Sequence, residues 1–188
     1  MTARFDPQAR NHQFPILQAL SERVLVFDGG MGTQIHGANL TLDDFRGLEG
    51  CNELLVETRP DVIEAIHERY FQAGADVVET NTFGGMDYVL DEFGLGDRSF
   101  ELNEVAAKLA RRVADRMSTA DRPRFVAGSM GPGTKLVTIG HITTHELFES
   151  YKVYAKGLIA GGVDCLNIET CQDILQVKLA IIASRDAM

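Results

Sequence analysis

Four short apolar runs rich in β-branched residues alternate along this chain with four long amphipathic segments, and this alternation restricts its fold more than any other feature. The runs have the length of buried strands and cover residues 24–27, 76–80, 124–128 and 164–169. The amphipathic segments are expected to be helices and cover residues 60–73, 100–117, 144–160 and 174–187. Strands that alternate with helices predict a parallel sheet with right-handed crossovers, which is an α/β fold.

Two of the helix-to-strand junctions resemble each other, "AGADVVETNT" and "GGVDCLNIETCQD". In both, a helix ends at glycine, an aspartate opens the next strand, and a Glu-Thr pair lies near the far end of that strand. A flavodoxin-like open sheet and a (β/α)8 barrel both fit such repeated units. Four units fill the chain from residue 24 onward, whereas a complete barrel has eight units and about 250 residues. The residues alone therefore leave open a small four-stranded sheet or half of a larger fold.

Charge and composition exclude several classes of partner. The net charge of −9 argues against nucleic acid and anionic membranes. No window is apolar enough to span a membrane, and the first twenty residues lack the apolar centre of a signal peptide. Cys51, Cys165 and Cys171 form no CxxC pair and no even disulfide framework. We therefore expect a soluble protein in the cytoplasm.

The stretch "VLVFDGGMGTQ" ends an apolar run with an acid and three closely spaced glycines. A dinucleotide site needs G-x-G-x-x-G followed at once by a helix, whereas the segment after these glycines shows no clean helical period. A phosphate-binding loop is therefore disfavoured. Glycine lets backbone approach a ligand, so N–H groups at Gly29 and Gly30 could bind a carboxylate while Asp28 binds an ammonium group. This combination suits an amino acid.

Side-chain alternation places acids from the first and fourth strands on one face. The residues expected on that face are Val24, Val26, Asp28, Cys165, Asn167 and Glu169. Those expected to face the covering helices are Leu25, Phe27, Leu166 and Ile168. In a barrel, Asp28 and Glu169 would then meet at the C-terminal rim, where active sites form. The alternative is that each acid only caps a loop.

Four stretches together resemble the homocysteine S-methyltransferase family, and within it the N-terminal homocysteine-binding module of the cobalamin-dependent enzymes. They are "VLVFDGGMGTQ", "CNELLVETRPDVIEAIHERYFQAGADVVETNTFG", "AGSMGPGTKL" and "GLIAGGVDCLNIETCQDILQVKLAI". The family folds as a TIM (β/α)8 barrel, so the resemblance implies that residues 24–188 form its first half, a partial homocysteine-binding domain of four βα units. Residues 1–23 would form a helical lead-in.

The family methylates the sulfur of homocysteine to give methionine, and in the cobalamin-dependent enzymes the methyl group comes from methylcobalamin, recharged by methyltetrahydrofolate. By this resemblance Asp28 and Glu169 would hold the homocysteine ammonium group. Backbone around Gly29 and Gly30 would take its carboxylate. Thr80 and Thr82, at the end of the second strand, would line the pocket.

Family members bind the thiol on zinc, held by three cysteines from later strands, because a zinc-bound sulfur is a nucleophilic thiolate. This sequence has no Cys-Cys pair. We therefore expect zinc ligands, catalytic residues and the cobalamin domain to be absent from this chain, which alone should show little turnover. The exposed edges of a half-barrel are expected to make it self-associate. The alternatives are a methyltransferase using betaine or S-methylmethionine, and a non-catalytic module that binds amino acids.

Overall fold

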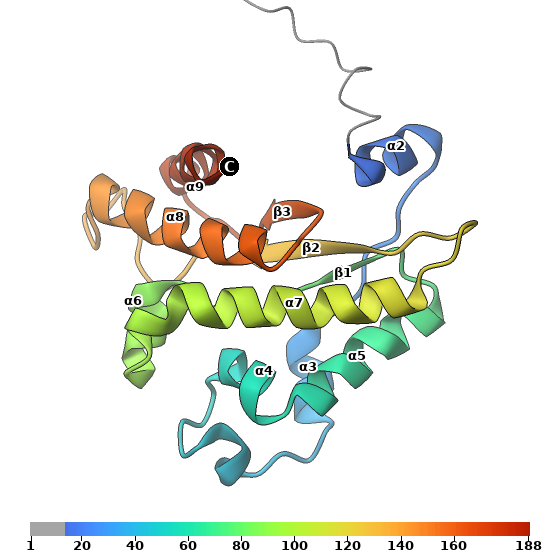
Figure 1. Cartoon of the computed structure of the whole chain (residues 1–188). Helices are drawn as coiled ribbons and strands as arrows, with labels where there is room; N and C mark the ends of the chain where they lie inside the picture. The colour runs from blue at the N-terminus through green and yellow to red at the C-terminus, as the bar shows by residue number, and fades with distance from the viewer. Residues whose placement is uncertain (1–13) are drawn as a thin grey trace, which may run out of the picture.

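The computed structural model describes residues 14–188, which form an open parallel sheet with helices on both faces (Figure 1). The strands are β1 (Val77–Glu79), β2 (Phe125–Met130) and β3 (Cys165–Ile168), in the order β1-β2-β3. Register pairs Glu79 with Ala127 and Ala127 with Cys165. The predicted parallel α/β fold is thus confirmed for the second, third and fourth runs, with strand limits that differ by one or two residues.

The first expected strand, residues 24–27, is not a strand of this sheet. It makes a single parallel bridge between Phe27 and Val77, supported by a 2.9 Å bond from the Asp28 N–H to the Val77 carbonyl. Val24 on this segment is 84% exposed. Since β1 is only three residues long and the other side of the segment has no strand partner among residues 14–188, no regular ladder forms. The four-strand prediction is therefore corrected to three strands and one bridged segment.

The four long helices lie where the periodicity predicts them. They are α5 (Pro60–Ala73), α7 (Ser99–Met117), α8 (Thr144–Ala160) and α9 (Ile174–Ala187). Thr143 and Glu146 form the expected capping box at the start of α8, which satisfies backbone N–H groups of the first turn. Gly74 ends α5 with a φ of 116°, a conformation that glycine adopts without a Cβ clash.

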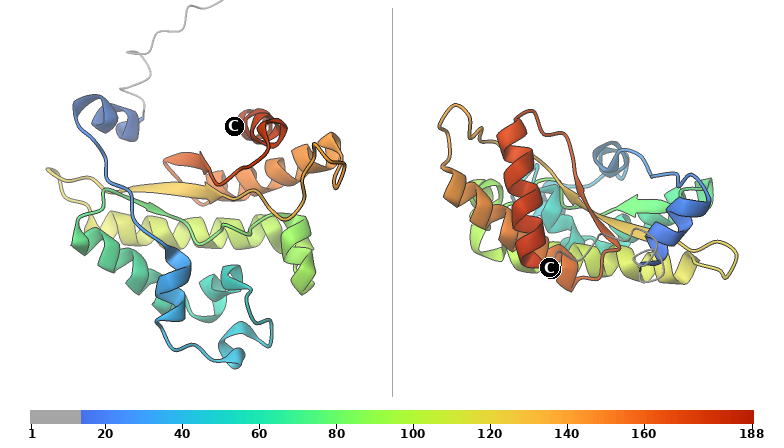
Figure 2. Two further views of the ribbon diagram at one scale, coloured as in Figure 1. Left: turned by 180° about the vertical axis from the view of Figure 1, so that it is seen from behind. Right: turned by 90° about the horizontal axis from the view of Figure 1, so that it is seen from above.

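Helices α5 and α7 cover one face of the sheet, while α2 (Pro15–Glu22) lies against the other, as both side views show (Figures 1 and 2). Val78 and Val126 point into the helical layer and pack against Phe71 of α5 and Val113 of α7. Leu166 and Ile168 contact the core that α8 and α9 build, as their alternation predicts. Of the expected lead-in, residues 1–13 lie outside the described part of the chain.

The alternation expected for the first run is wrong. Leu25 is buried, but it packs with Val77, Phe125 and Cys165 on the face opposite α5 and α7. Val26, expected on the pocket face, is 55% exposed. Because only one bridge fixes this segment to β1, the strict two-residue alternation of a ladder is not maintained.

The connections carry short helical turns. They are α3 (Met31–His36), η1 (Leu42–Phe45), η2 (Asn52–Leu54), α4 (Leu55–Thr58), α6 (Asp87–Leu90), η3 (Asp91–Phe93) and η4 (Gly96–Arg98). The start of α3 directly after Gly30 corrects the expectation that no helix follows the glycines. Its six residues are too few to show a clear period in the sequence. None of the described helices is long and apolar enough to cross a membrane.

Candidate functional site

A cavity of about 420 Å³ opens at the carboxyl ends of the strands. Its walls are Asp28, Gly29, Gly30, Met31, Gly32, Glu79, Thr80, Asn81, Thr82, Phe83, Ser129 and Glu169. All six residues singled out in the sequence line it, namely Asp28, Gly29, Gly30, Thr80, Thr82 and Glu169. The structure thus brings them together, and the ligand that they bind stays a prediction. The carboxyl end of a parallel sheet is the usual place for a binding site in α/β proteins.

Asp28 is fixed by the backbone of β1. The Glu79 N–H lies 3.1 Å from both carboxylate oxygens of Asp28. The Asp28 N–H in turn donates to the Val77 carbonyl at 2.9 Å. Asp28 therefore sits at the end of the bridged segment with its carboxylate at the strand end of β1, partly buried and aimed into the cavity.

Glu169 follows β3 directly and faces Asp28 across the same cavity. Its N–H continues the ladder to the Met130 carbonyl at 3.1 Å. The Ser129 hydroxyl donates to one carboxylate oxygen and the Thr170 hydroxyl, at 3.3 Å, to the other. Thr170 has a φ of 57°, so the chain leaves the direction of β3 immediately after Glu169.

Glu79 is a pocket residue that the sequence reasoning missed. Its carboxylate accepts a hydrogen bond from the side-chain amide of Asn167 on β3. This bond joins β1 and β3 across the face of β2, the strand between them. The signal was present in the repeated Glu-Thr pair, Glu79-Thr80 and Glu169-Thr170. Both glutamates of that pair line the cavity.

The hydroxyl groups of Thr80 and Thr82 are used within the protein. They lie 2.6 Å apart, Thr82 donates to the Ser129 carbonyl at 2.8 Å, and the Ser129 N–H donates to Thr80 at 3.0 Å. Since Thr82 gives its proton to Ser129, Thr80 must give its own to Thr82. Both residues are buried and line the cavity, but neither has a proton left for a ligand. Their role there is to fix the wall beside Ser129.

The glycine side of the cavity rests on Tyr70 of α5. The Tyr70 hydroxyl donates to the Gly30 carbonyl at 3.2 Å. A Cβ on Gly29 would lie 3.1 Å from that hydroxyl oxygen, closer than side chains normally pack. Backbone at Gly29 and Gly30 is exposed, so its polar groups are accessible to a ligand in the cavity.

The ionisable side chains that line the cavity are all acidic. Burial, and then the charges of Glu79 and Glu169, raise the pKa of Asp28 to about 7. Burial and the charge of Glu169 also raise the pKa of Glu79, against the hydrogen bond from Asn167. None of the residues that line this cavity is Lys, Arg or His. Such a site favours a ligand that carries a positive charge.

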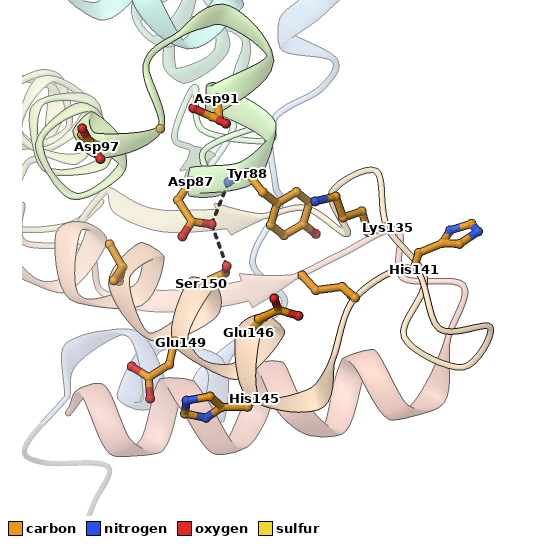
Figure 3. Close-up of a pocket in the computed structure, with 13 residues that line it drawn as sticks. Asp87, Tyr88, Asp91, Asp97, Lys135, His141, His145, Glu146, Glu149 and Ser150 are labelled. Carbon is orange, nitrogen blue, oxygen red and sulfur yellow. Dashed lines mark hydrogen bonds between the residues drawn. The ribbon is translucent and has the colours of Figure 1, made fainter.

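A larger cavity, of about 750 Å³, lies between α6 and the start of α8 (Figure 3). Asp87 accepts bonds there from the Ser150 hydroxyl at 2.6 Å and the Tyr88 N–H at 2.7 Å. Lys135 lies over the Tyr88 ring, 4.9 Å from its centre. These groups satisfy one another, and none of the residues predicted for the site lines this cavity. We therefore place the candidate site at the strand ends.

The described cysteines form no metal centre. Cys51, Cys165 and Cys171 are all free thiols, and Cys51 is fully buried. Among residues 14–188, no three His, Cys, Asp or Glu side chains are grouped so that they could hold a metal ion. The zinc implied by the family resemblance therefore does not fit the residues described.

Comparison with known proteins identifies relatives of this chain. A model of the homocysteine S-methyltransferase family matches residues 25–188. Methionine synthase of Mycobacterium leprae (strain TN) is 53% identical over 182 residues, which are 96% of this chain and 15% of that protein. Methionine synthase of Mycobacterium tuberculosis (strain ATCC 25618 / H37Rv) is 55% identical over 173 residues, 92% of this chain and 14% of that protein. This chain thus spans about a seventh of these relatives.

The fold has a counterpart among solved structures. The metallated form of the homocysteine methyltransferase MmuM from Escherichia coli superposes with a TM-score of 0.74 at 20% sequence identity, over 92% of this chain and 64% of that one. The oxidized form gives a TM-score of 0.75 at 22% identity. At such identities the likeness concerns the fold alone.

Proposed function

Because the chain belongs to the homocysteine S-methyltransferase family, we propose that it is the homocysteine-binding half-barrel of an enzyme that methylates homocysteine to methionine. The observation that carries the proposal is the meeting of Asp28 and Glu169, two acids 141 positions apart by number (169 − 28), in one cavity. Two carboxylates at one end and exposed glycine backbone at the other match the ammonium and carboxylate groups of a free amino acid. The fold likeness to MmuM over 64% of its chain supports the half-barrel.

The proposed methyl donor is methylcobalamin recharged by methyltetrahydrofolate. The support is the identity of 53% and 55% to methionine synthases, against 20% to MmuM. The alternative donor is betaine or S-methylmethionine. Free cysteines support the cytoplasmic setting.

In this proposal the described residues bind and orient the substrate. Two carboxylates approach the ammonium group, those of Asp28 and Glu169. The Glu79 N–H holds the first and the Ser129 hydroxyl holds the second. Backbone at Gly29 and Gly30 binds the carboxylate, which leaves the thiol pointing away from the acids. Thr80 and Thr82 keep the intervening wall rigid. No step of methyl transfer is assigned to these residues.

Calorimetric titration of the purified chain with homocysteine tests this assignment. Asp28→Asn and Glu169→Gln should each weaken binding by roughly 30-fold, since a charge-assisted hydrogen bond contributes about 2 kcal/mol. Glu149→Gln, the same change on the exposed face of α8, is the matched control and should bind as the wild type does. Equal affinity of all four proteins, or no binding by the wild type, would refute the proposed site.

A further inference from the structure

Glu79 is the third carboxylate of the pocket, and it is held from both sides. Its backbone N–H donates to Asp28, and its own side chain accepts from Asn167. Asn167 lies two positions before Glu169 and on the same face of β3, so the amide reaches Glu79 across the sheet. Three acids from three parallel segments therefore converge on one cavity whose lining contains no basic side chain.

Resting on the proposed function, we propose that Glu79, held by Asn167, is a specificity-determining residue of the ammonium end of the pocket, and that an amino acid binds there with release of a proton from the cluster of Asp28, Glu79 and Glu169. The ligand arrives as an ammonium ion and remains one. The proton leaves a carboxylic acid of the cluster for water. The added carboxylate favours a primary ammonium group over a neutral ligand of the same shape.

The physical reason is crowding of like charges. Three partly buried carboxylates without a cation cannot all ionise at the pKa of an isolated acid, so the empty cluster retains a proton near neutral pH. The direction agrees with the pKa of Asp28, which burial and the two glutamates raise to about 7. An ammonium ion supplies the missing positive charge, and the retained proton is then expelled.

The other titratable groups around the cluster do not offset this effect. Cys165 lies on the same face of β3, and burial, Asp164 and Glu79 raise the pKa of its thiol to about 11. Burial likewise raises the pKa of Tyr154, whose hydroxyl bonds to the Ser129 carbonyl at 2.7 Å. Both groups are neutral at pH 7, so the charge of the cluster is set by its three carboxylates.

The proton count can be measured by titrating the chain with homocysteine in two buffers that differ in ionisation enthalpy. With a pKa of about 7 at Asp28, we expect release of about one proton at pH 6 and about half a proton at pH 7. Affinity should rise with pH up to about 7, because the retained proton competes with the ammonium group below that pH.

Two variants should change the proton count in opposite directions. Glu79→Gln removes a like charge, so the pKa of Asp28 falls towards the value that burial alone sets, and proton release at pH 7 decreases. Asn167→Ala removes the donor that favours ionised Glu79, so the cluster retains more proton and release at pH 7 increases. Glu149→Gln should leave the count unchanged. A purely structural role for Glu79 would alter stability without this opposed pattern.

Carboxyl carbon NMR of the ligand-free chain separates this inference from the proposed function. We expect Asp28 to titrate near pH 7 in the wild type and at lower pH in Glu79→Gln. An Asp28 titration that Glu79→Gln leaves in place, or homocysteine binding without proton release, would overturn the inference. If Glu79→Gln does not fold, the number of protons released by the wild type and by Asn167→Ala tests the inference. If Asp28 titrates near pH 7 but the chain does not bind homocysteine, the proposed function is overturned. The interaction between the charges of Asp28 and Glu79 would still hold.

Discussion

Gly29 has a steric requirement that follows from a single neighbour. Its α-carbon lies over Tyr70, so that an added Cβ would stand 3.1 Å from the hydroxyl oxygen and 3.2 Å from the nearest ring carbon. The same hydroxyl donates to the Gly30 carbonyl at 3.2 Å. Any displacement of Tyr70 therefore also displaces the backbone that we propose binds the substrate carboxylate.

We predict that Gly29→Ala weakens homocysteine binding roughly fivefold, since about 1 kcal/mol accompanies the loss of one hydrogen bond. Calorimetry should show the loss for homocysteine but not for its decarboxylated analogue, which lacks the group bound at this end. Gly37→Ala is the matched control, because a Cβ built there meets only backbone oxygens at 3.6 Å and Gly37 does not line this cavity. An equal loss for both ligands would mean that Gly29 acts through the fold and not through the carboxylate.

At the same scale, the residues that sequence reasoning found and missed differ in one respect. Asp28 directly follows its apolar run and Glu169 is the last residue of its own, so their arrival at one sheet edge could be predicted from parallel strands. Glu79 was missed because its importance depends on Asn167, a partner 88 positions away that no local pattern names. The hydroxyl chain of Thr80 and Thr82 likewise depends on the backbone of Ser129.

At the scale of elements, the repeated Gly-x-Asp junction has a structural meaning. Asp76 accepts hydrogen bonds from the Val26 N–H at 3.0 Å and from Arg23 at 2.8 Å. Asp164 accepts from the Val126 N–H at 2.7 Å and from Arg111, also at 2.7 Å. In both cases the aspartate that opens one strand fixes the start of the preceding extended segment. The repeat visible in the sequence is thus a device that joins neighbouring segments at the N-terminal edge of the sheet.

We predict that Asp76→Ala lowers the free energy of unfolding by about 3 kcal/mol, because it leaves buried positive charge without its partner. The Asp76 side chain is 4% exposed and lies within 3.9 Å of Arg124, whose side chain is 7% exposed. Urea denaturation would measure the change. Asp115→Ala is the control. It removes the ion pair between Arg111 and the 67% exposed side chain of Asp115, and should lower the free energy of unfolding by less than about 1 kcal/mol. Similar losses for the two variants would contradict the argument.

The elements also show where sequence reasoning is strong. The long helices were predicted closely because α5, α7 and α8 carry periodic apolar faces, and because Gly74 and the Thr143 capping box mark ends locally. Residues 24–27 were predicted as a strand because their composition suits one. A strand is defined by its hydrogen bonds to neighbouring strands, however. The composition of a segment does not determine how many neighbouring strands it pairs with.

At the scale of the whole molecule, the open sheet leaves apolar surface uncovered. Among residues 14–188, β3 pairs only with β2, and the segment at Val26 pairs only with β1. Val24, Val26 and Ile182 are 84%, 55% and 55% exposed. Unpaired edges next to exposed apolar side chains favour pairing with another copy of the same chain.

We therefore predict that the purified chain self-associates at micromolar concentration, as a two-fold dimer in which these edges are covered. Sedimentation velocity should show an average mass that rises with concentration. Val26→Lys should shift the equilibrium towards monomer, because a charge at an edge opposes pairing. Ile182→Lys should do the same, because it places a charge on the exposed apolar surface of α9. Leu42→Lys, at a residue 54% exposed on η1 and outside both edges, should leave the equilibrium unchanged. A wild-type monomer throughout this range would contradict the prediction, because it would show that the open sheet is stable without a second copy.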